Sequence, residues 1–187
     1  MSLALGLVRI FAPPGLKKMI LKELYLATAR AFEVAPPAGL DRLSHASLLE
    51  SYAAFTTSEA GRLLGDPARA ARAEERLFDE ARALGEAMRR ALRLRTGRDI
   101  LAASRVVYAA LGIDFEGRET GEAVIRRCYF SRFYTAGICK LMSSADAGAA
   151  AGLSGGGRLV FSQRITQGAE ACLARLDLDF LPGRAGR

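Results

Sequence analysis

Hydrophobic residues in the first 112 positions recur at intervals of three and four, the spacing that places them on one face of an α-helix. Proline, aspartate, serine and glycine interrupt this pattern at points where helices are expected to begin or end. We therefore predict four helices in this part of the chain. They run from Pro14 to about Val34, from Asp41 or Ser44 to Gly65, from Asp66-Pro67 to Thr96, and from Ile100 to Gly112.

The third predicted helix carries a regular apolar stripe with 4-3-4-3 spacing, formed by Leu77, Ala81, Leu84, Met88 and Ala91. The stripe is too short to indicate a coiled coil. Packing against other helices of the same chain is therefore the favoured interpretation. A homodimer formed through these helices is the alternative.

After Gly112 the pattern becomes that of short strands around one further helix. We predict an α+β fold in which the N-terminal helices pack with a β-β-α-β-β antiparallel sheet unit. The chain is interpreted as a single domain, 1–187, with a mainly helical part, 1–112, and an α+β part, 113–180. The predicted strands are Ile113–Arg118, Glu122–Phe130, Arg158–Arg164 and Ala169–Leu178; the helix is Thr135–Ala151, Gly152–Gly157 is a flexible link, and Pro182–Arg187 a frayed tail.

Alternation within the strands assigns side chains to faces of the sheet, because successive residues of a strand point in opposite directions. In the last strand, Cys172 shares a mostly apolar face with Ala174 and Leu176. In the second strand, strict alternation places Cys128 on the same face as Arg126.

Composition limits the class of protein. Half of the 187 residues are hydrophobic and a quarter are charged, which is typical of a globular chain. No apolar run approaches the ~20 residues of a membrane span, and Leu3–Val8 lacks the basic flank of a signal peptide. We therefore expect no stable membrane insertion and a cytoplasmic location, with reduced thiols.

The net charge of +7 raises the question of an acidic partner. Its densest cluster consists of Arg89, Arg90, Arg93, Arg95 and Arg98, and it closes a helix whose opening carries Glu74, Glu75, Asp79 and Glu80. Acidic residues first and basic residues last is the order that the helix dipole favours. No aromatic residue interleaves with the arginines, so we predict no nucleic-acid partner.

Cysteine offers the main candidate chemistry, since the chain has three cysteines, Cys128, Cys139 and Cys172, and one histidine. Simple core packing is the usual role of a free cysteine. The alternatives are a nucleophilic thiolate, a redox pair between Cys128 and Cys172, and a metal or iron–sulfur site. A metal or iron–sulfur site needs about four protein ligands, but the chain has three cysteines, and His45 is distant from them in sequence. We therefore predict no metal and no cofactor.

Three segments together resemble the L-2-amino-thiazoline-4-carboxylic acid hydrolase family. They are Arg127-Cys128-Tyr129-Phe130, the helix containing Asp146-Ala147-Gly148, and Gly168 to Arg175 with Cys172. The resemblance covers about Ile113–Leu178. Two departures are the apolar Leu173 and Ala174 after the terminal cysteine, and Cys139, which is offset from the family's helix cysteine and is interpreted as a packing residue.

The resemblance implies a hydrolase that opens a small cyclic amidine by thiol- or water-mediated attack. It implies that Cys128 or Cys172 supplies the thiol and that Asp146 holds the amidinium. Arg126 or Arg175 would bind the substrate carboxylate, and Tyr129 would also contact the substrate.

Two other functions remain open. One is non-catalytic binding of an apolar small molecule, with the cysteines lining the pocket. The other is a thiol redox or iron–sulfur protein. Pocket polarity distinguishes hydrolysis from binding: an arginine and an aspartate converging on one point would favour hydrolysis, and an apolar cavity would favour binding.

Overall fold

The computed structural model describes residues 14–177, so the apolar stretch Leu3–Val8 and the predicted tail Pro182–Arg187 lie outside the described residues. It contains five α-helices and a four-stranded antiparallel sheet within this range, which confirms the predicted α+β class with helices first. The helices are α2 (Pro14–Ala31), α3 (His45–Leu63), α4 (Pro67–Leu92), α5 (Gly97–Ala110) and α6 (Ala136–Ser154), and the strands are β1 (Ile113–Gly117), β2 (Glu122–Cys128), β3 (Leu159–Gln163) and β4 (Cys172–Leu176).

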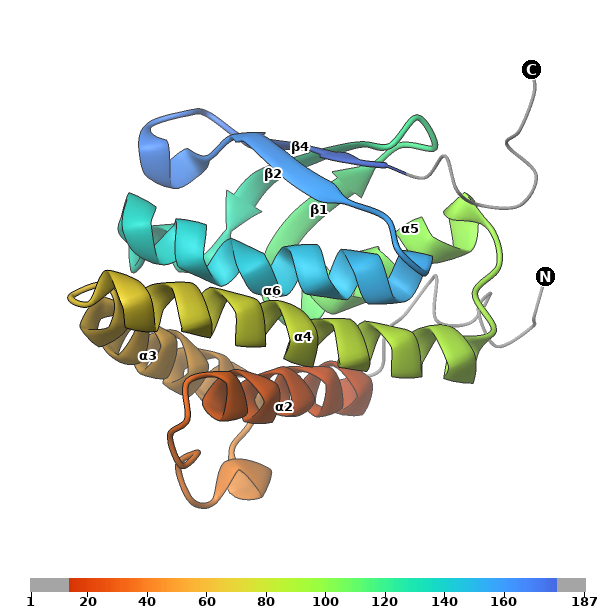
Figure 1. Cartoon of the computed structure of the whole chain (residues 1–187). Helices are drawn as coiled ribbons and strands as arrows, with labels where there is room; N and C mark the ends of the chain where they lie inside the picture. The colour runs from red at the N-terminus through yellow and green to blue at the C-terminus, as the bar shows by residue number, and fades with distance from the viewer. Residues whose placement is uncertain (1–13, 178–187) are drawn as a thin grey trace.

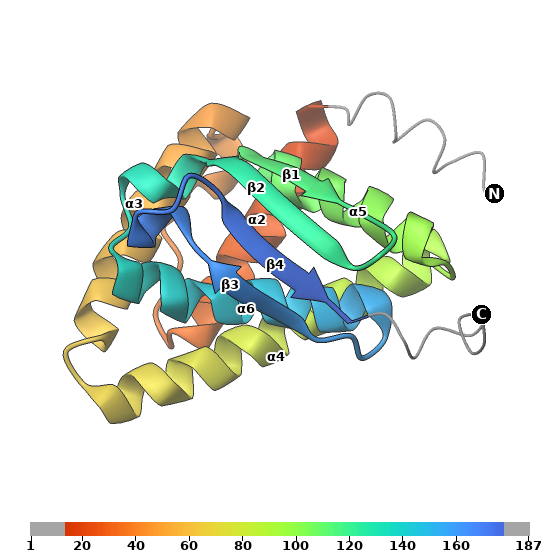
Figure 2. The same ribbon diagram turned by 90° about the horizontal axis from the view of Figure 1, so that it is seen from above.

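The sheet has the strand order β1-β2-β4-β3, with every neighbouring pair antiparallel. Helices α5 and α6 lie against one face of the sheet, and α4, α2 and α3 lie beyond them (Figure 1). Figure 2 looks onto the opposite face, where no described element covers the strands. The covered face of the sheet and the helices beneath it therefore enclose the space where a site can form.

Local sequence signals explain where the helices begin. Ser44, Asp66, Thr96 and Thr135 each accept a hydrogen bond at the N-cap of a helix, from the backbone of Ser47, Ala68, Asp99 and Ile138 respectively. Of the two cap residues expected for the second helix, Ser44 is the one used, and Asp41 lies in the 3-10 helix Leu40–Arg42.

Helices α4 and α6 run parallel and in very close contact, because Gly148 lies beside Phe78 and Gly152 lies beside Arg82. A Cβ atom on either glycine would overlap a backbone carbonyl oxygen of α4. On α4, Gly85 makes the reciprocal approach: a Cβ there would lie 2.7 Å from the carbonyl oxygen of Ala149. We call these residues, Gly85, Gly148 and Gly152, the glycine contact.

The structure of α4 and α6 corrects two predictions. Gly152 is a buried helical residue and not the start of a flexible link, because α6 continues to Ser154 and ends at Gly155. The buried stripe of α4 also follows Leu77, Ala81 and Gly85. Ala91, the last member of the predicted stripe, is exposed.

The predicted second strand is shorter than expected, and it is irregular. Strand β2 ends at Cys128, and Tyr129–Arg132 form a 3-10 helix. Asp114 pairs with Arg127, but the next residue, Phe115, pairs with Ile125, so Arg126 is the extra residue of a β-bulge. Arg126 and Arg127 are both exposed as a result.

No helix within residues 14–177 combines the length and hydropathy that crossing a bilayer requires.

Candidate functional site

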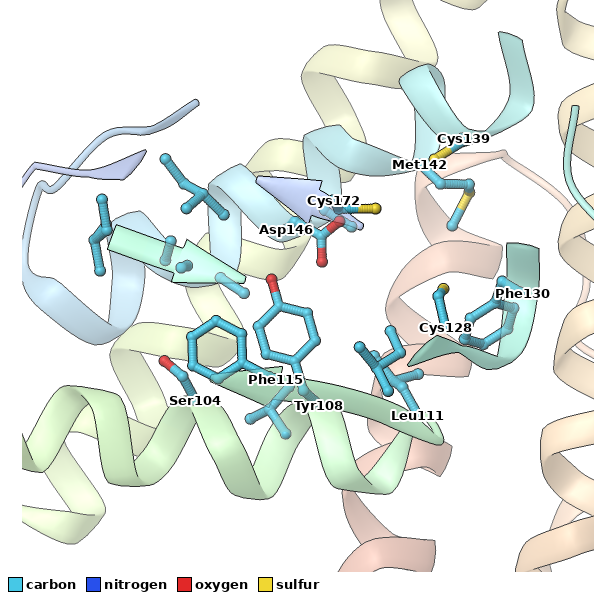
Figure 3. A pocket seen from close by; sticks show the side chains of 18 of the residues that line it. Ser104, Tyr108, Leu111, Phe115, Cys128, Phe130, Cys139, Met142, Asp146 and Cys172 are labelled. Carbon is cyan, nitrogen blue, oxygen red and sulfur yellow. The ribbon is translucent and has the colours of Figure 1, made fainter. Parts of the chain in front are cut away.

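A cavity of about 120 Å³ lies between the sheet and helices α5 and α6 (Figure 3). Its size is close to that of an engineered cavity of ~150 Å³ that binds benzene. We call it the central cavity. Most of its lining is aliphatic or aromatic, including Val107, Leu111, Phe115, Phe130, Met142 and Leu153; its polar members include Ser104, Tyr108, Cys128, Cys139, Asp146, Thr166 and Cys172.

The β2 bulge brings Cys128 to this cavity. Before the bulge, Ala123 and Ile125 point to the covered face and are buried. Because Arg126 and Arg127 both point outward, Cys128 returns to the covered face, where it lines the cavity. The expectation that Cys128 shares a face with Arg126 is therefore wrong.

Cys172 lies on the covered face of β4 as predicted, buried with Leu176. Its sulfur accepts a hydrogen bond of 3.3 Å from the backbone N–H of Ile165. Cys139, interpreted from the sequence as a packing residue, is only half-buried and lines the same cavity from α6. All three thiols are free and border one space.

The register of the sheet separates Cys128 from Cys172. Cys172 pairs with Ile125, so Cys128 lies three residues further along β2, one of them bulged. That offset amounts to roughly 7–10 Å along a strand. Together with the spacing between neighbouring strands, it exceeds the ~7 Å between Cα atoms that a disulfide allows, which disfavours a direct redox pair.

Two acids belong to the lining of the central cavity: Asp146, whose surroundings desolvate its carboxyl, and Glu122, which is exposed. Asp146 projects from α6 toward the space between the sheet and α5, and the Tyr108 hydroxyl points toward it (Figure 3). Burial raises the pKa of Asp146 to about 6; a hydrogen bond from Tyr108 and the positive charge of Arg164 oppose that rise only in part. Among the described residues, Asp146 forms no ion pair, so its charge is not neutralised by a direct partner.

Two thiols of this cavity, those of Cys128 and Cys139, are protonated at neutral pH. Burial raises the pKa of Cys128 to about 11, although two backbone hydrogen bonds, at Phe130 and Ser131, oppose the rise. Burial also raises the pKa of Cys139. No thiolate of Cys128 is therefore available as a nucleophile without a further change at the site.

The two arginines expected to bind a carboxylate lie on the uncovered face of the sheet. Arg126 forms an ion pair with Glu116 of β1 at 2.5 Å. Arg175 is exposed on β4, opposite Glu122 in the register. Neither lines the central cavity, so the site does not bring them together with Asp146.

Tyr129 lines a different hollow, on the outside, with Arg127 and Arg132. The guanidinium of Arg132 lies 4.2 Å from the centre of the Tyr129 ring. Ile113, Cys128 and Ser131 border both this outer hollow and the central cavity. These three residues separate the outer hollow from the central cavity. Tyr129 therefore lies on the outer side of them and not beside Asp146.

Sequence reasoning missed Tyr108 and Arg164. Tyr108 lies in the apolar pattern of its helix and packs accordingly, with the centre of its ring 4.6 Å from that of Phe115 in a stacked arrangement. Arg164 donates a hydrogen bond to Ser143, one turn of α6 before Asp146. An alternation of polar and apolar residues could not have connected either one to Asp146, because they come from different elements.

Two further tyrosines line the cavity with their hydroxyl groups already occupied. The Tyr52 hydroxyl lies 2.9 Å from the hydroxyl of Thr28, and the Tyr134 hydroxyl lies 2.6 Å from that of Thr56. Burial holds the pKa of Tyr134 well above its usual value, so it stays neutral. Both tyrosine hydroxyls of this part of the lining therefore already have a hydrogen-bond partner.

His45 does not approach the cysteines. It begins α3, and its Nε2 lies 2.8 Å from the carbonyl oxygen of Ala110. Within residues 14–177, no group of three or more histidine, cysteine, aspartate and glutamate residues has an arrangement that could hold a metal ion.

Comparison of this chain with protein-family models, with curated proteins and with solved structures found no match.

Proposed function

We propose that this protein binds a small molecule with an apolar body and one basic group of the amidine type in the central cavity. The observation that supports this proposal is Asp146, an acid without an ion-pair partner among the described residues, in an otherwise mostly apolar cavity. Burial removes hydrogen bonds that water would donate to this carboxylate. An amidinium would replace them by donating two charge-assisted hydrogen bonds. The apolar lining would hold the rest of the molecule.

Binding should depend on Asp146. We expect 2-aminothiazoline, a cyclic amidine of suitable size, to bind the wild-type protein at pH 7.5 and to bind Asp146→Asn at least 10-fold more weakly, since a carboxylate hydrogen bond contributes about 1.5–3 kcal/mol. Isothermal titration calorimetry measures both affinities. Wild-type affinity should also fall between pH 7.5 and pH 5, because Asp146 takes up a proton near pH 6.

Asp114→Asn is the matched control, because Asp114 is an exposed acid on the uncovered face, in an ion pair with Arg127. It removes the same charge and should bind like the wild type. Equal affinity of Asp146→Asn and the wild type would exclude the proposal.

Hydrolysis of a cyclic amidine is the second candidate, as the family resemblance implies. One observation favours it: a carboxyl with a pKa near 6 suits a general base at neutral pH. The protonated state of Cys128 favours water over a thiolate as the attacking group. Water would add to the ring carbon between nitrogen and sulfur, Asp146 would take its proton, and the carbon–sulfur bond would break to release a thiol.

This reaction can be followed directly, because each turnover exposes one new thiol that a thiol-reactive dye detects. We expect 2-aminothiazoline-4-carboxylate to yield thiol with the wild type and with Cys172→Ala, and at least 100-fold more slowly with Asp146→Asn, as for loss of a general base. Loss of turnover in Cys172→Ala with an unchanged fold would favour a thiol mechanism instead. No turnover by the wild type would leave binding as the function of the cavity.

A further inference from the structure

A second hollow lies at the C-terminal ends of α4 and α6, and five arginines line it. It has a volume of about 540 Å³ and lies where α4 and α6 end side by side. Its lining consists of Arg82, Glu86, Arg89, Arg90, Arg93, Leu94, Arg95, Gly155 and Gly156. We call it the arginine hollow. It shares no residue with the central cavity.

The helix spacing explains how the charges gather. Arg82, Glu86, Arg89 and Arg93 follow one another at intervals of three and four, so they occupy one side of α4. Arg93 itself ends the helix in the left-handed conformation, with a φ of 52°, and turns the chain toward Arg95. The arginines are therefore concentrated at the helix end that faces Gly155.

Gly155 makes room for this arrangement. It ends α6 with a φ of 86°, and a Cβ there would overlap the guanidinium of Arg89. The guanidinium consequently lies directly against the backbone turn after α6. Gly156, the next residue, has open space around the position of a Cβ. At Gly156 the hollow therefore exposes bare backbone, which a ligand can approach closely.

The positive charge exceeds what the protein itself neutralises. Glu86 is the acid of the hollow; it pairs with Arg82 at 2.9 Å and with Arg90 at 3.9 Å. Within residues 14–177, the guanidinium groups of Arg89, Arg93 and Arg95 form no ion pair; the backbone N–H of Arg95 donates a hydrogen bond to Asp99. Two helix C-termini contribute about half a negative charge each, which offsets only about one of these three cations.

We propose that the arginine hollow binds a small polyphosphate, such as inorganic pyrophosphate or the phosphate chain of a nucleotide. Guanidinium groups match phosphate oxygens with paired hydrogen bonds, and several in one hollow suit a ligand with several charges. No aromatic residue lines the hollow, so it offers no stacking surface for a base. The phosphate groups alone would then set the affinity.

The test is calorimetric titration of pyrophosphate into the full chain at constant ionic strength. We expect one site, with at least 10-fold weaker binding for the double variant Arg93→Ala/Arg95→Ala. Adenosine triphosphate should bind about as tightly as inorganic tripolyphosphate. Sulfate at the same ionic strength should bind much more weakly, because it carries fewer charges.

The control is Arg69→Ala/Arg72→Ala, which removes the same charge from exposed positions near the other end of the same helix. This variant should keep the wild-type affinity. Equal weakening in both double variants would show that pyrophosphate responds to net charge alone, which would overturn the proposal, as would the absence of binding to the wild type. Arg93→Lys/Arg95→Lys preserves the charge and should bind more weakly than the wild type if paired guanidinium bonds matter.

Discussion

Replacing Gly148 with alanine is expected to destabilise the protein by at least about 3 kcal/mol, an effect at the upper end for overpacking a core. The added Cβ would overlap the carbonyl oxygen of Phe78 and lie within 3 Å of the carbonyl carbon and Cα of the same residue. All three are backbone atoms, so no side-chain rotation relieves the overlap. The two helices would have to move apart, which also weakens the contacts of Gly85 and Gly152.

Gly61→Ala is the matched control. Gly61 lies in α3, and no atom lies within 4 Å of the position of its Cβ. The same substitution should therefore stabilise the protein by about 0.5–1 kcal/mol, because alanine favours the helix more than glycine does. Urea denaturation of both variants gives the comparison. A loss of less than 1 kcal/mol in Gly148→Ala would contradict the close approach of α4 and α6.

Replacing Asp146 with asparagine is expected to stabilise the protein at pH 8 by about 3 kcal/mol. Burial raises the pKa of Asp146 from 3.8 to about 6, so the folded state holds this proton more tightly than the unfolded chain does. Above pH 6 the folded protein carries a buried charge that costs about 1.4 kcal/mol for each unit of the shift. Between pH 6 and pH 4 the cost disappears as the carboxyl becomes protonated.

The sign of this effect makes the prediction specific. The contribution of Asp146 should lower the stability of the wild type as pH rises from 4 to 6.5. Most carboxylates have the opposite effect and stabilise a fold as pH rises. The stability difference between Asp146→Asn and the wild type, measured by urea denaturation, should be near zero at pH 4 and largest at pH 8. A difference independent of pH would indicate that Asp146 is not buried as described.

A buried acid that lowers stability at neutral pH points to a use for that acid. Proteins often retain a destabilising group where function needs it, and replacing such a group raises stability and lowers activity. For Asp146 the two measurements can be made on one variant: stability should increase and affinity for 2-aminothiazoline should decrease. A gain in stability without any loss in binding would leave Asp146 without a function.

The fold class could be predicted from the sequence because the period of the apolar residues changes near Gly112, from helical to strand-like. The order of the strands could not, since β2 and β4 are neighbours although α6 and β3 separate them in the chain. The length of α6 was underestimated for a physical reason. Gly152 was interpreted as a breaker, whereas here the missing side chain lets two helices touch.

The candidate site was predictable in part. Cys128, Cys172 and Asp146 were singled out from the sequence, and all three line one cavity. The bulge at Arg126 was not predictable, because two successive arginines do not by themselves disclose an extra residue in a strand. Arg175 is different: strict alternation had already placed it opposite Cys172, and its exposure agrees with that alternation.

The glycine contact also determines which parts of the fold can make way for a ligand. Helix α6 lines the central cavity and touches α4 backbone to backbone, so α6 cannot move away from the cavity without displacing α4 as well. The opposite wall is the sheet, whose far side no described element supports. A ligand larger than the cavity would therefore displace the strands outward, while α4 and α6 keep their positions.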